Sequence, residues 1–249
     1  MILIKGADEI ALMSEAGRIV AEALEAIRTS VVPGITTGEL DRLAYHLIIK
    51  KGGEPAFKGY RGYPASICSS VNEQVVHGIP SGRKLKQGDI VSIDLGVKYR
   101  DYYGDAALTC AVGEANQAAK DLMRATEEAL WLGIGQAVPG NRVSDISHAV
   151  QKHAEAKGFS VVRSFVGHGI GRSLHEEPQV PNFGPPGKGP RLVKGMALAI
   201  EPMVNAGNWQ VKVLDDGWTA VTIDGRLSAH YEHTVIITDG EPLVLTKLP

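Results

Sequence analysis

The chain has 249 residues and a formal net charge of −2 at pH 7, which gives no electrostatic reason to expect nucleic acid or a membrane as its main partner. Hydrophobic residues make up 44% of it and charged residues 22%, a globular composition, and the two cysteines, Cys68 and Cys110, are too few for a disulfide framework or zinc knuckle. Because charges begin at Lys5 and no later window is apolar for long enough, the sequence predicts neither a signal peptide nor a membrane span, and we expect a cytoplasmic protein.

The first part of the chain predicts two helices. Residues from about 7 to 29 place apolar side chains at three-and-four spacing, typical of an amphipathic helix that ends before Val32-Pro33-Gly34. Thr36 and Glu39 then form a capping-box pattern, which opens a second helix. Gly52-Gly53 closes that helix.

Residues Gly88 to Val112 alternate with period two on both sides of a polar turn, which predicts a hairpin of half-buried strands. With Tyr99 and Arg100 as the turn, Asp94 lies directly opposite Asp105, at about 4.5–5.5 Å. Two carboxylates at that distance repel by about 3 kcal/mol at an effective dielectric constant near 20. Divalent cations would neutralise the pair, because hard metals take carboxylate oxygens. A solvated hairpin face with two incidental aspartates is the alternative at this point.

The pattern of two helices returns after the hairpin. Residues from about 114 to 136 and from 143 to 157 each predict a helix. Val138-Pro139-Gly140 repeats the earlier Val-Pro-Gly at an offset of 106 (138 − 32), and Gly158 repeats Gly52 at the same offset (158 − 52). The constant offset predicts an internal duplication.

The remaining sequence predicts strands around one loop. Strands are expected at residues 160–166, 194–204 and 228–238. The proline- and glycine-rich stretch 176–192 is expected to be a surface loop. No long linker or charge block divides the chain. We therefore expect a single domain over residues 1–249, with pseudo-twofold halves of about 1–112 and 113–249 that meet in a cleft.

Three further residues could complete a metal site with the hairpin aspartates: His168, Glu201 and Glu232. Taken singly, each has an ordinary structural explanation, as a loop residue, a strand end or a solvent-facing side chain. Glu201, however, directly follows the apolar run 197–200, where an uncompensated carboxylate is costly. Four carboxylates and one neutral imidazole would also balance the charge of two divalent ions.

Several stretches together resemble the bacterial type I methionine aminopeptidases, and they span nearly the whole chain: YPASICSSVNEQVVHGIP at 63–80, SIDLGV with YGD at 92–105, FVGHGIGRSLHEEP at 165–178, IEPMVNAG at 200–207, DDGWT at 215–219 and SAHYEHTVIIT at 228–238. The resemblance implies an α+β "pita-bread" fold, in which helices flank an antiparallel sheet around a dinuclear metal centre. It also implies that the chain removes the initiator methionine of nascent polypeptides by hydrolysing the first peptide bond with a metal-activated water. Aminopeptidases are among the enzymes known for such two-metal sites.

The resemblance assigns the ligands residue by residue. Asp94 would hold one ion, His168 and Glu201 the other, and Asp105 and Glu232 would bridge the two. Both ions would be divalent, and this ligand set leaves Co, Mn, Fe and Zn open. The free α-amino group of the substrate would bind the ion held by Asp94.

The resemblance also assigns the substrate site. Glu201 would shuttle a proton, His175 would stabilise the oxyanion, and His77 would lie beside the scissile amide. The substrate-binding residues would be Tyr60, Tyr63, Cys68, His77, Leu174, His175 and Trp218. Leu174 stands where an aromatic residue is common, and Phe57 stands where a smaller one is common. The sequence therefore does not determine the shape of the pocket.

The implied partners are nascent polypeptides, with a transient ribosome contact allowed, and we expect a monomer. A prolidase or aminopeptidase P relative is one alternative, but such proteins generally carry an additional N-terminal domain, and this chain starts directly at the catalytic part. A binding protein that has lost catalysis is the other. It should lack one or more metal ligands, whereas all five are present here.

Overall fold

The computed structural model describes residues 1–248. Its helices are α1 (Ala7–Ser30), α2 (Thr37–Lys50), α3 (Gln117–Ile134) and α4 (Val143–Ala156), with a short 3-10 turn, η1, at Tyr60–Gly62. Its strands are β1 (Glu54–Pro55), β2 (Cys68–Val71), β3 (Gln74–Val76), β4 (Ile90–Tyr99), β5 (Tyr102–Ala111), β6 (Ser160–Val161), β7 (Gly167–Gly169), β8 (Glu176–Val180), β9 (Ala197–Ile200), β10 (Met203–Asn205), β11 (Val211–Val213), β12 (Ala220–Thr222), β13 (Ser228–His230), β14 (Glu232–Ile236) and β15 (Leu243–Val244). Among the described residues, no helix is long and apolar enough to cross a bilayer.

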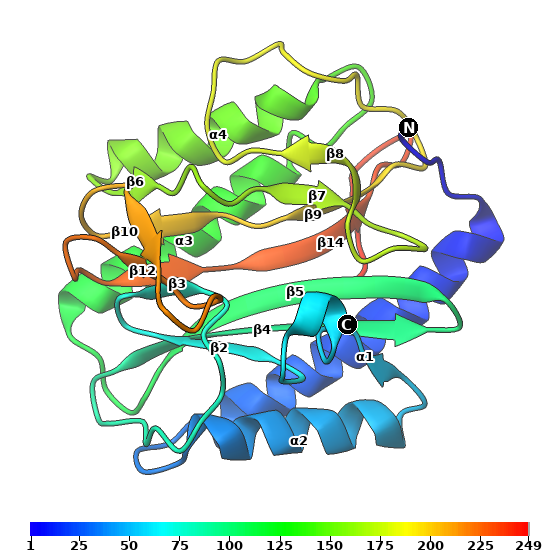
Figure 1. Cartoon of the computed structure of the whole chain (residues 1–249). Helices are drawn as coiled ribbons and strands as arrows, with labels where there is room; N and C mark the ends of the chain where they lie inside the picture. The colour runs from blue at the N-terminus through cyan, green and yellow to red at the C-terminus, as the bar shows by residue number, and fades with distance from the viewer. Residues whose placement is uncertain (249) are drawn as a thin grey trace.

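A large antiparallel sheet runs through the molecule with helices beside it (Figure 1). Its strands follow the order β1-β4-β5-β14-β9-β7-β8, with β2 added on β4 and β15 on β14. One apolar core joins α1 and α2 to β4, through residues such as Ile19, Leu40 and Ile93. A second core joins α3 and α4 to β9 and β14, through residues such as Leu130 and Ile146. This arrangement confirms the expected α+β class.

The helices follow the sequence pattern closely. The capping box of α2 forms as expected, because the Thr36 hydroxyl accepts the backbone N–H of Glu39 at 3.2 Å and the Glu39 carboxylate accepts that of Thr36 at 2.8 Å. The third helix is shorter than the expected span of 114–136. It begins after Asn116, whose side-chain oxygen accepts the N–H of Ala119 at 2.9 Å and so caps the helix.

The two helix pairs agree with the predicted offset. Helix α4 is α2 shifted by 106 residues at both ends (143 − 37 and 156 − 50). Gly34 and Gly140, related by the same offset, both have φ of 95°, a left-handed conformation that glycine adopts without steric cost. The division of a single domain into two equivalent halves stays a prediction.

The turn of the β4–β5 hairpin differs from the expected one. Tyr99 pairs with Tyr102, so the turn residues are Arg100 and Asp101. Both have positive φ, 45° and 67°, as a two-residue turn that matches the strand twist requires. The Lys98 ammonium lies 2.9 Å from the Asp101 carboxylate and adds a contact across this turn.

The expected pairing of Asp94 with Asp105 is therefore wrong. Asp94 pairs with Ala107, and Asp105 pairs with Gly96, so the two carboxylates are diagonal neighbours on one face rather than directly opposed. The strands are also not half-buried. Residues on both faces are covered, since Ile93 is 0% exposed and Asp94 only 9%. The alternative of a solvated hairpin face is excluded by this burial.

Other strand predictions need correction as well. The expected strands at 194–204 and 228–238 are each divided in two, into β9 and β10 and into β13 and β14. Pro202 explains the first division, because it has no N–H to donate to a neighbouring strand. Of the stretch 160–166 only the first two residues form a strand, and β7 begins just after it. The stretch 176–192 is not entirely a loop, since its first five residues form β8.

Candidate active site

Three carboxylates lie in one row across neighbouring strands. Asp94 on β4 pairs with Ala107 on β5, and Ala107 pairs with Glu232 on β14. Paired residues of antiparallel strands point to the same face, so Asp94 and Glu232 share a face with only a methyl side chain between them. Glu201 directly follows the last residue of β9, and the register of β9 with β14 continues to place it opposite Glu232.

A second row runs beside the first. Asp105 lies two residues from Ala107 on β5 and hence on the same face. The hydroxyl of Thr234 donates to the Asp105 carbonyl oxygen at 2.8 Å and accepts the Asp105 N–H at 3.0 Å. Thr234 pairs with Ala199, which pairs with His168 on β7. The row therefore holds Asp105 and His168 at its ends, with small side chains between them.

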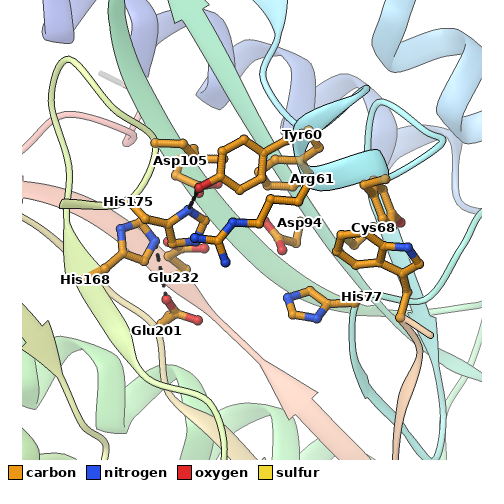
Figure 2. Close-up of a pocket in the computed structure, with 14 residues that line it drawn as sticks. Tyr60, Arg61, Cys68, His77, Asp94, Asp105, His168, His175, Glu201 and Glu232 are labelled. Atoms are coloured by element: carbon orange, nitrogen blue, oxygen red, sulfur yellow. Dashed lines mark hydrogen bonds and ion pairs between the residues drawn. The ribbon is translucent and has the colours of Figure 1, made fainter. Parts of the chain in front are cut away.

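The two rows face a cavity of about 150 Å³ (Figure 2). Every site residue expected from the sequence contributes to the wall of this cavity. The expected metal ligands on its wall are Asp94, Asp105, His168, Glu201 and Glu232. The expected substrate residues there are Tyr60, Tyr63, Cys68, His77, Leu174, His175 and Trp218. Asp105, His168 and Glu232 bring ligand atoms within 4.8 Å of one another, close enough to hold an ion together.

The carboxylates are buried without sufficient partners. One oxygen each of Asp94, Asp105 and Glu232 is buried and accepts no hydrogen bond. Burial raises the pKa of Asp105 to about 7, and it raises the pKa values of Asp94, Glu201 and Glu232 well above their usual range. The charge of Asp105 is the next largest cause of the raised pKa at each of the other three. Such a group of buried acids is costly unless a cation neutralises it.

His168 turns one ring nitrogen to a backbone carbonyl and leaves the other free of that bond. Its Nδ1 lies 2.8 Å from the carbonyl oxygen of Gly169, which can only accept, so Nδ1 carries the proton and Nε2 has a free lone pair. Nε2 lies 3.6 Å from a carboxylate oxygen of Glu201. Burial lowers the pKa of His168 to about 4, so its imidazole is neutral at pH 7. Unpartnered carboxylate oxygens and a neutral imidazole are donors that suit divalent metal ions.

Two histidines stand at the cavity beside these ligands. The Nδ1 atom of His175 lies 2.9 Å from the Tyr60 hydroxyl, and the two rings stack with centroids 5.3 Å apart. The His175 ring is also 4.2 Å from that of His168. His77 follows β3 and lies edge-on to Trp218 at 6.3 Å. Burial lowers the pKa of His77 and lowers that of His175 to about 3, so both are neutral near pH 7.

An aromatic and apolar wall closes one side of the cavity. Tyr63 donates its hydroxyl to the carbonyl oxygen of Gly78 at 3.1 Å, and its ring meets Trp218 edge-on at 5.0 Å. Cys68 pairs with Asp94 across β2 and β4, and its thiol is buried beside the acids. Burial first, and then the charge of Asp94, raises the pKa of this thiol, which therefore stays protonated.

A model of metallopeptidase family M24 matches residues 11–239. The chain belongs to metallopeptidase family M24. This M24 chain is 56% identical over 248 residues to methionine aminopeptidase from Clostridium perfringens. It is 54% identical over 248 residues to methionine aminopeptidase 1 from Bacillus subtilis. Each comparison covers 100% of this chain and 100% of the relative. The crystal structure of methionine aminopeptidase from Thermotoga maritima superposes with a TM-score of 0.98 at 51% identity, again over 100% of both chains. These matches confirm the resemblance and the pita-bread fold, and they disfavour the prolidase alternative.

Phe57 and Leu174, the two residues that left the shape of the pocket undetermined in the sequence, contact the same place in this M24 chain. A Cβ atom on Gly96 would lie 2.9 Å from the Phe57 ring and 3.4 Å from Cδ1 of Leu174. Both side chains therefore cover Gly96, which is the strand partner of Asp105. The large residue at 57 lies where it can fill space that the small residue at 174 leaves open.

Sequence reasoning missed two polar residues of the site. Arg61 lines the cavity, with its guanidinium 5.4 Å from the centre of the Tyr60 ring. His230 is buried with its Nε2 lacking a hydrogen-bond partner, 3.9 Å from a carboxylate oxygen of Glu201. The period-two alternation of SAHYEHT could have identified His230, since it stands two residues before Glu232. No local pattern marked Arg61.

Proposed function

We propose that this cavity is the catalytic centre through which the chain removes the N-terminal methionine of nascent polypeptides by hydrolysing the first peptide bond. The chain is 54–56% identical, over its full length, to enzymes named methionine aminopeptidase, and we assign it the same activity. The observation that supports this site for the activity is the convergence of four buried carboxylates and a neutral imidazole on one cavity beside an apolar wall.

The residues that would hold metal are the five on the two rows. We assign Asp94 to one divalent ion, His168 and Glu201 to a second, and Asp105 and Glu232 to a bridging role. The unpartnered oxygens of Asp94, Asp105 and Glu232 support this assignment. When bound, divalent ions supply a Lewis acid that polarises a carbonyl and lowers the pKa of water. The ligand types leave Co, Mn, Fe and Zn as candidates.

The remaining chemistry falls to side chains of the chain itself. Glu201, whose pKa is raised by burial, is placed to take a proton from the attacking water and pass it to the leaving amine nitrogen. His175 would donate a hydrogen bond to the oxygen on which negative charge develops. In this role the Tyr60 hydroxyl would donate to Nδ1, which leaves the proton on Nε2 for the bond to that oxygen. His77 would lie beside the scissile amide.

The apolar wall fits the side chain of methionine. Tyr63 and Trp218 both line the cavity, and a thioether gains about 0.3–1.5 kcal/mol from contact with an aromatic ring. Leu174 and Phe57 close the wall near Asp105. We expect the enzyme to act as a cytoplasmic monomer, and its net charge of −2 favours at most a transient contact with the ribosome.

Metal removal tests the proposal. The metal-free chain is expected to leave the tripeptide Met-Ala-Ser uncut, and activity should return as two divalent ions bind per chain. Each of Co, Mn, Fe and Zn would be added in turn, with calorimetry to count the ions and chromatography to follow free methionine. N-acetylated Met-Ala-Ser is the control and should not be cleaved. Full activity without metal, or equal cleavage of the acetylated peptide, would exclude the mechanism.

Leu174→Phe tests the pocket. We expect the parent to accept an N-terminal leucine or norleucine somewhat better than the variant, because the smaller residue leaves a looser wall. One methylene is worth about 1–3 kcal/mol in such a pocket, so methionine stays preferred in both. The measurement is the ratio of kcat/KM for methionine and leucine peptides. Identical ratios in parent and variant would show that residue 174 does not shape the pocket.

A further inference from the structure

A buried ion pair lies behind the loop that carries His175. The Nζ atom of Lys5 is 2.5 Å from Oε2 of Glu176, and the two side chains are only 4% and 7% exposed. Among the Lys and Arg ion pairs within residues 1–248, this is the one with both partners so deeply buried. The backbone N–H of Lys5 also donates to the Gly195 carbonyl oxygen at 2.8 Å, which ties the segment before α1 to the residues just before β9.

The other oxygen of Glu176 fastens the loop itself. Oε1 accepts the backbone N–H of Arg172 at 2.8 Å and that of Ser173 at 3.2 Å. One carboxylate thus joins the Lys5 ammonium to two consecutive backbone groups of the loop 171–175. The loop leads directly to His175, the residue before Glu176.

Tight packing leaves this loop little freedom to move. A Cβ atom at Gly171 would lie 2.4 Å from Cε of Lys5 and 2.8 Å from Oε1 of Glu176, so the loop backbone rests directly on the ion pair. Its carbonyl oxygen accepts the N–H of Tyr103 on β5 at 2.9 Å. At the far end, the His175 ring stacks on Tyr60 in the cavity (Figure 2).

We propose that Lys5 and Glu176 are positioning residues that hold His175 in place for the transition state. The inference rests on the role proposed above for His175. Neither residue lines the cavity, so neither touches substrate or metal. They act through the loop, because a catalytic donor displaced by about 1 Å can lose much of its effect.

Lys5→Met is the principal test, because methionine is unbranched and only one atom shorter than lysine, and it removes the charge. The Glu176 carboxylate then loses its counter-ion in a buried place and is expected to release the two N–H groups of the loop. We expect kcat on Met-Ala-Ser to fall about tenfold to hundredfold, with KM nearly unchanged and metal content unchanged. Lys5→Arg keeps the charge and should recover most of the activity. Arg28→Met removes an exposed ion pair with Glu25 on α1 and serves as the matched control.

A double-mutant cycle separates positioning from general destabilisation. If Lys5 acts through His175, Lys5→Met should have almost no effect on kcat in a His175→Ala background. An equal reduction in both backgrounds, or a lower Tm with unchanged kcat, would overturn the proposal. A normal kcat for His175→Ala itself would instead overturn the role of His175, and the inference with it.

A double variant tests the same proposal if Lys5→Met alone does not fold. In Lys5→Met/Glu176→Gln both partners are neutral, and the side-chain amide oxygen can still accept the N–H groups of Arg172 and Ser173. Replacing both members of a buried ion pair is often tolerated where removing one is not. We expect this double variant to fold and to keep kcat within about threefold of the parent. A large loss of kcat in a folded, metal-loaded double variant would count against the proposal.

Discussion

An Asp105→Asn variant is expected to bind metal more weakly at both positions while its metal-free form becomes more stable. Asp105 is proposed as a bridge, so its loss removes a ligand from each ion, and we expect affinity to fall more than the roughly tenfold to hundredfold typical of a change beside a ligand. Without metal, the charge of the same carboxylate destabilises the folded chain. Its charge raises the pKa values of Asp94, Glu201 and Glu232, and asparagine relieves that repulsion.

The effect on stability has a defined pH window. Burial raises the pKa of Asp105 from an ordinary 3.8 to about 7 in the folded chain, so folding opposes its ionisation. This cost is absent below about pH 4, grows as the pH rises, and is fully present above about pH 7. With a chelator present, Asp105→Asn should therefore have a higher Tm than the parent at pH 8, and the difference should shrink towards pH 4.

Calorimetric metal titration and thermal unfolding with and without chelator measure both effects. Asp94→Asn is the matched control, since Asp94 is assigned to one ion only and its loss should mainly empty one position. Equal loss of both ions in the two variants would contradict the distinction between bridging and terminal ligands. A lower Tm for metal-free Asp105→Asn at pH 8 would contradict the account of repulsion among the buried acids.

Local patterns predicted the helices well because helix ends are set by nearby residues. The Thr36 and Glu39 cap and the Gly52 stop needed no information from the rest of the chain. The hairpin was harder. Its turn uses Arg100 and Asp101 at positive φ, where glycine or asparagine would have been the usual signal.

The hairpin error did not disturb the candidate site for a simple geometric reason. The predicted register was displaced by two residues, and side chains in a strand alternate with period two. Asp94 and Asp105 therefore stayed on the same face. A displacement of one residue would have moved one of them to the helix-packed side.

The assembly of the site could not be derived from local pattern. The two rows depend on the order β4-β5-β14-β9-β7, which brings together strands distant in sequence. Periodicity gave no way to choose that order, and the ligand assignment came from the resemblance instead. Arg61 was missed because tertiary packing alone brings it to the cavity wall, whereas His230, 3.9 Å from a Glu201 carboxylate oxygen, could have been found from its position two residues before Glu232.

His175→Ala is expected to lower kcat strongly while both metal ions stay bound. His175 lines the cavity and its Nδ1 lies within hydrogen-bonding distance of the Tyr60 hydroxyl, whereas His168, whose ring centre is 4.2 Å away, is the proposed ligand. An oxyanion forms only after attack, and interactions made only in the transition state reduce kcat when removed. The loss of one oxyanion donor costs about 2.7–4 kcal/mol, or roughly a hundred- to thousand-fold in kcat. Bound metal would still polarise the carbonyl, so we expect the lower end of that range.

His77→Ala provides the comparison. His77 lies against Trp218 on the wall of the proposed methionine pocket, so its loss should raise KM as well as lower kcat. Steady-state kinetics on Met-Ala-Ser, with metal content measured for every variant, distinguishes the two histidines. If His175→Ala loses an ion, or raises KM while kcat stays unchanged, His175 belongs to metal or ground-state substrate binding. If it lowers kcat alone, the hydrogen bond it donates is made in the transition state.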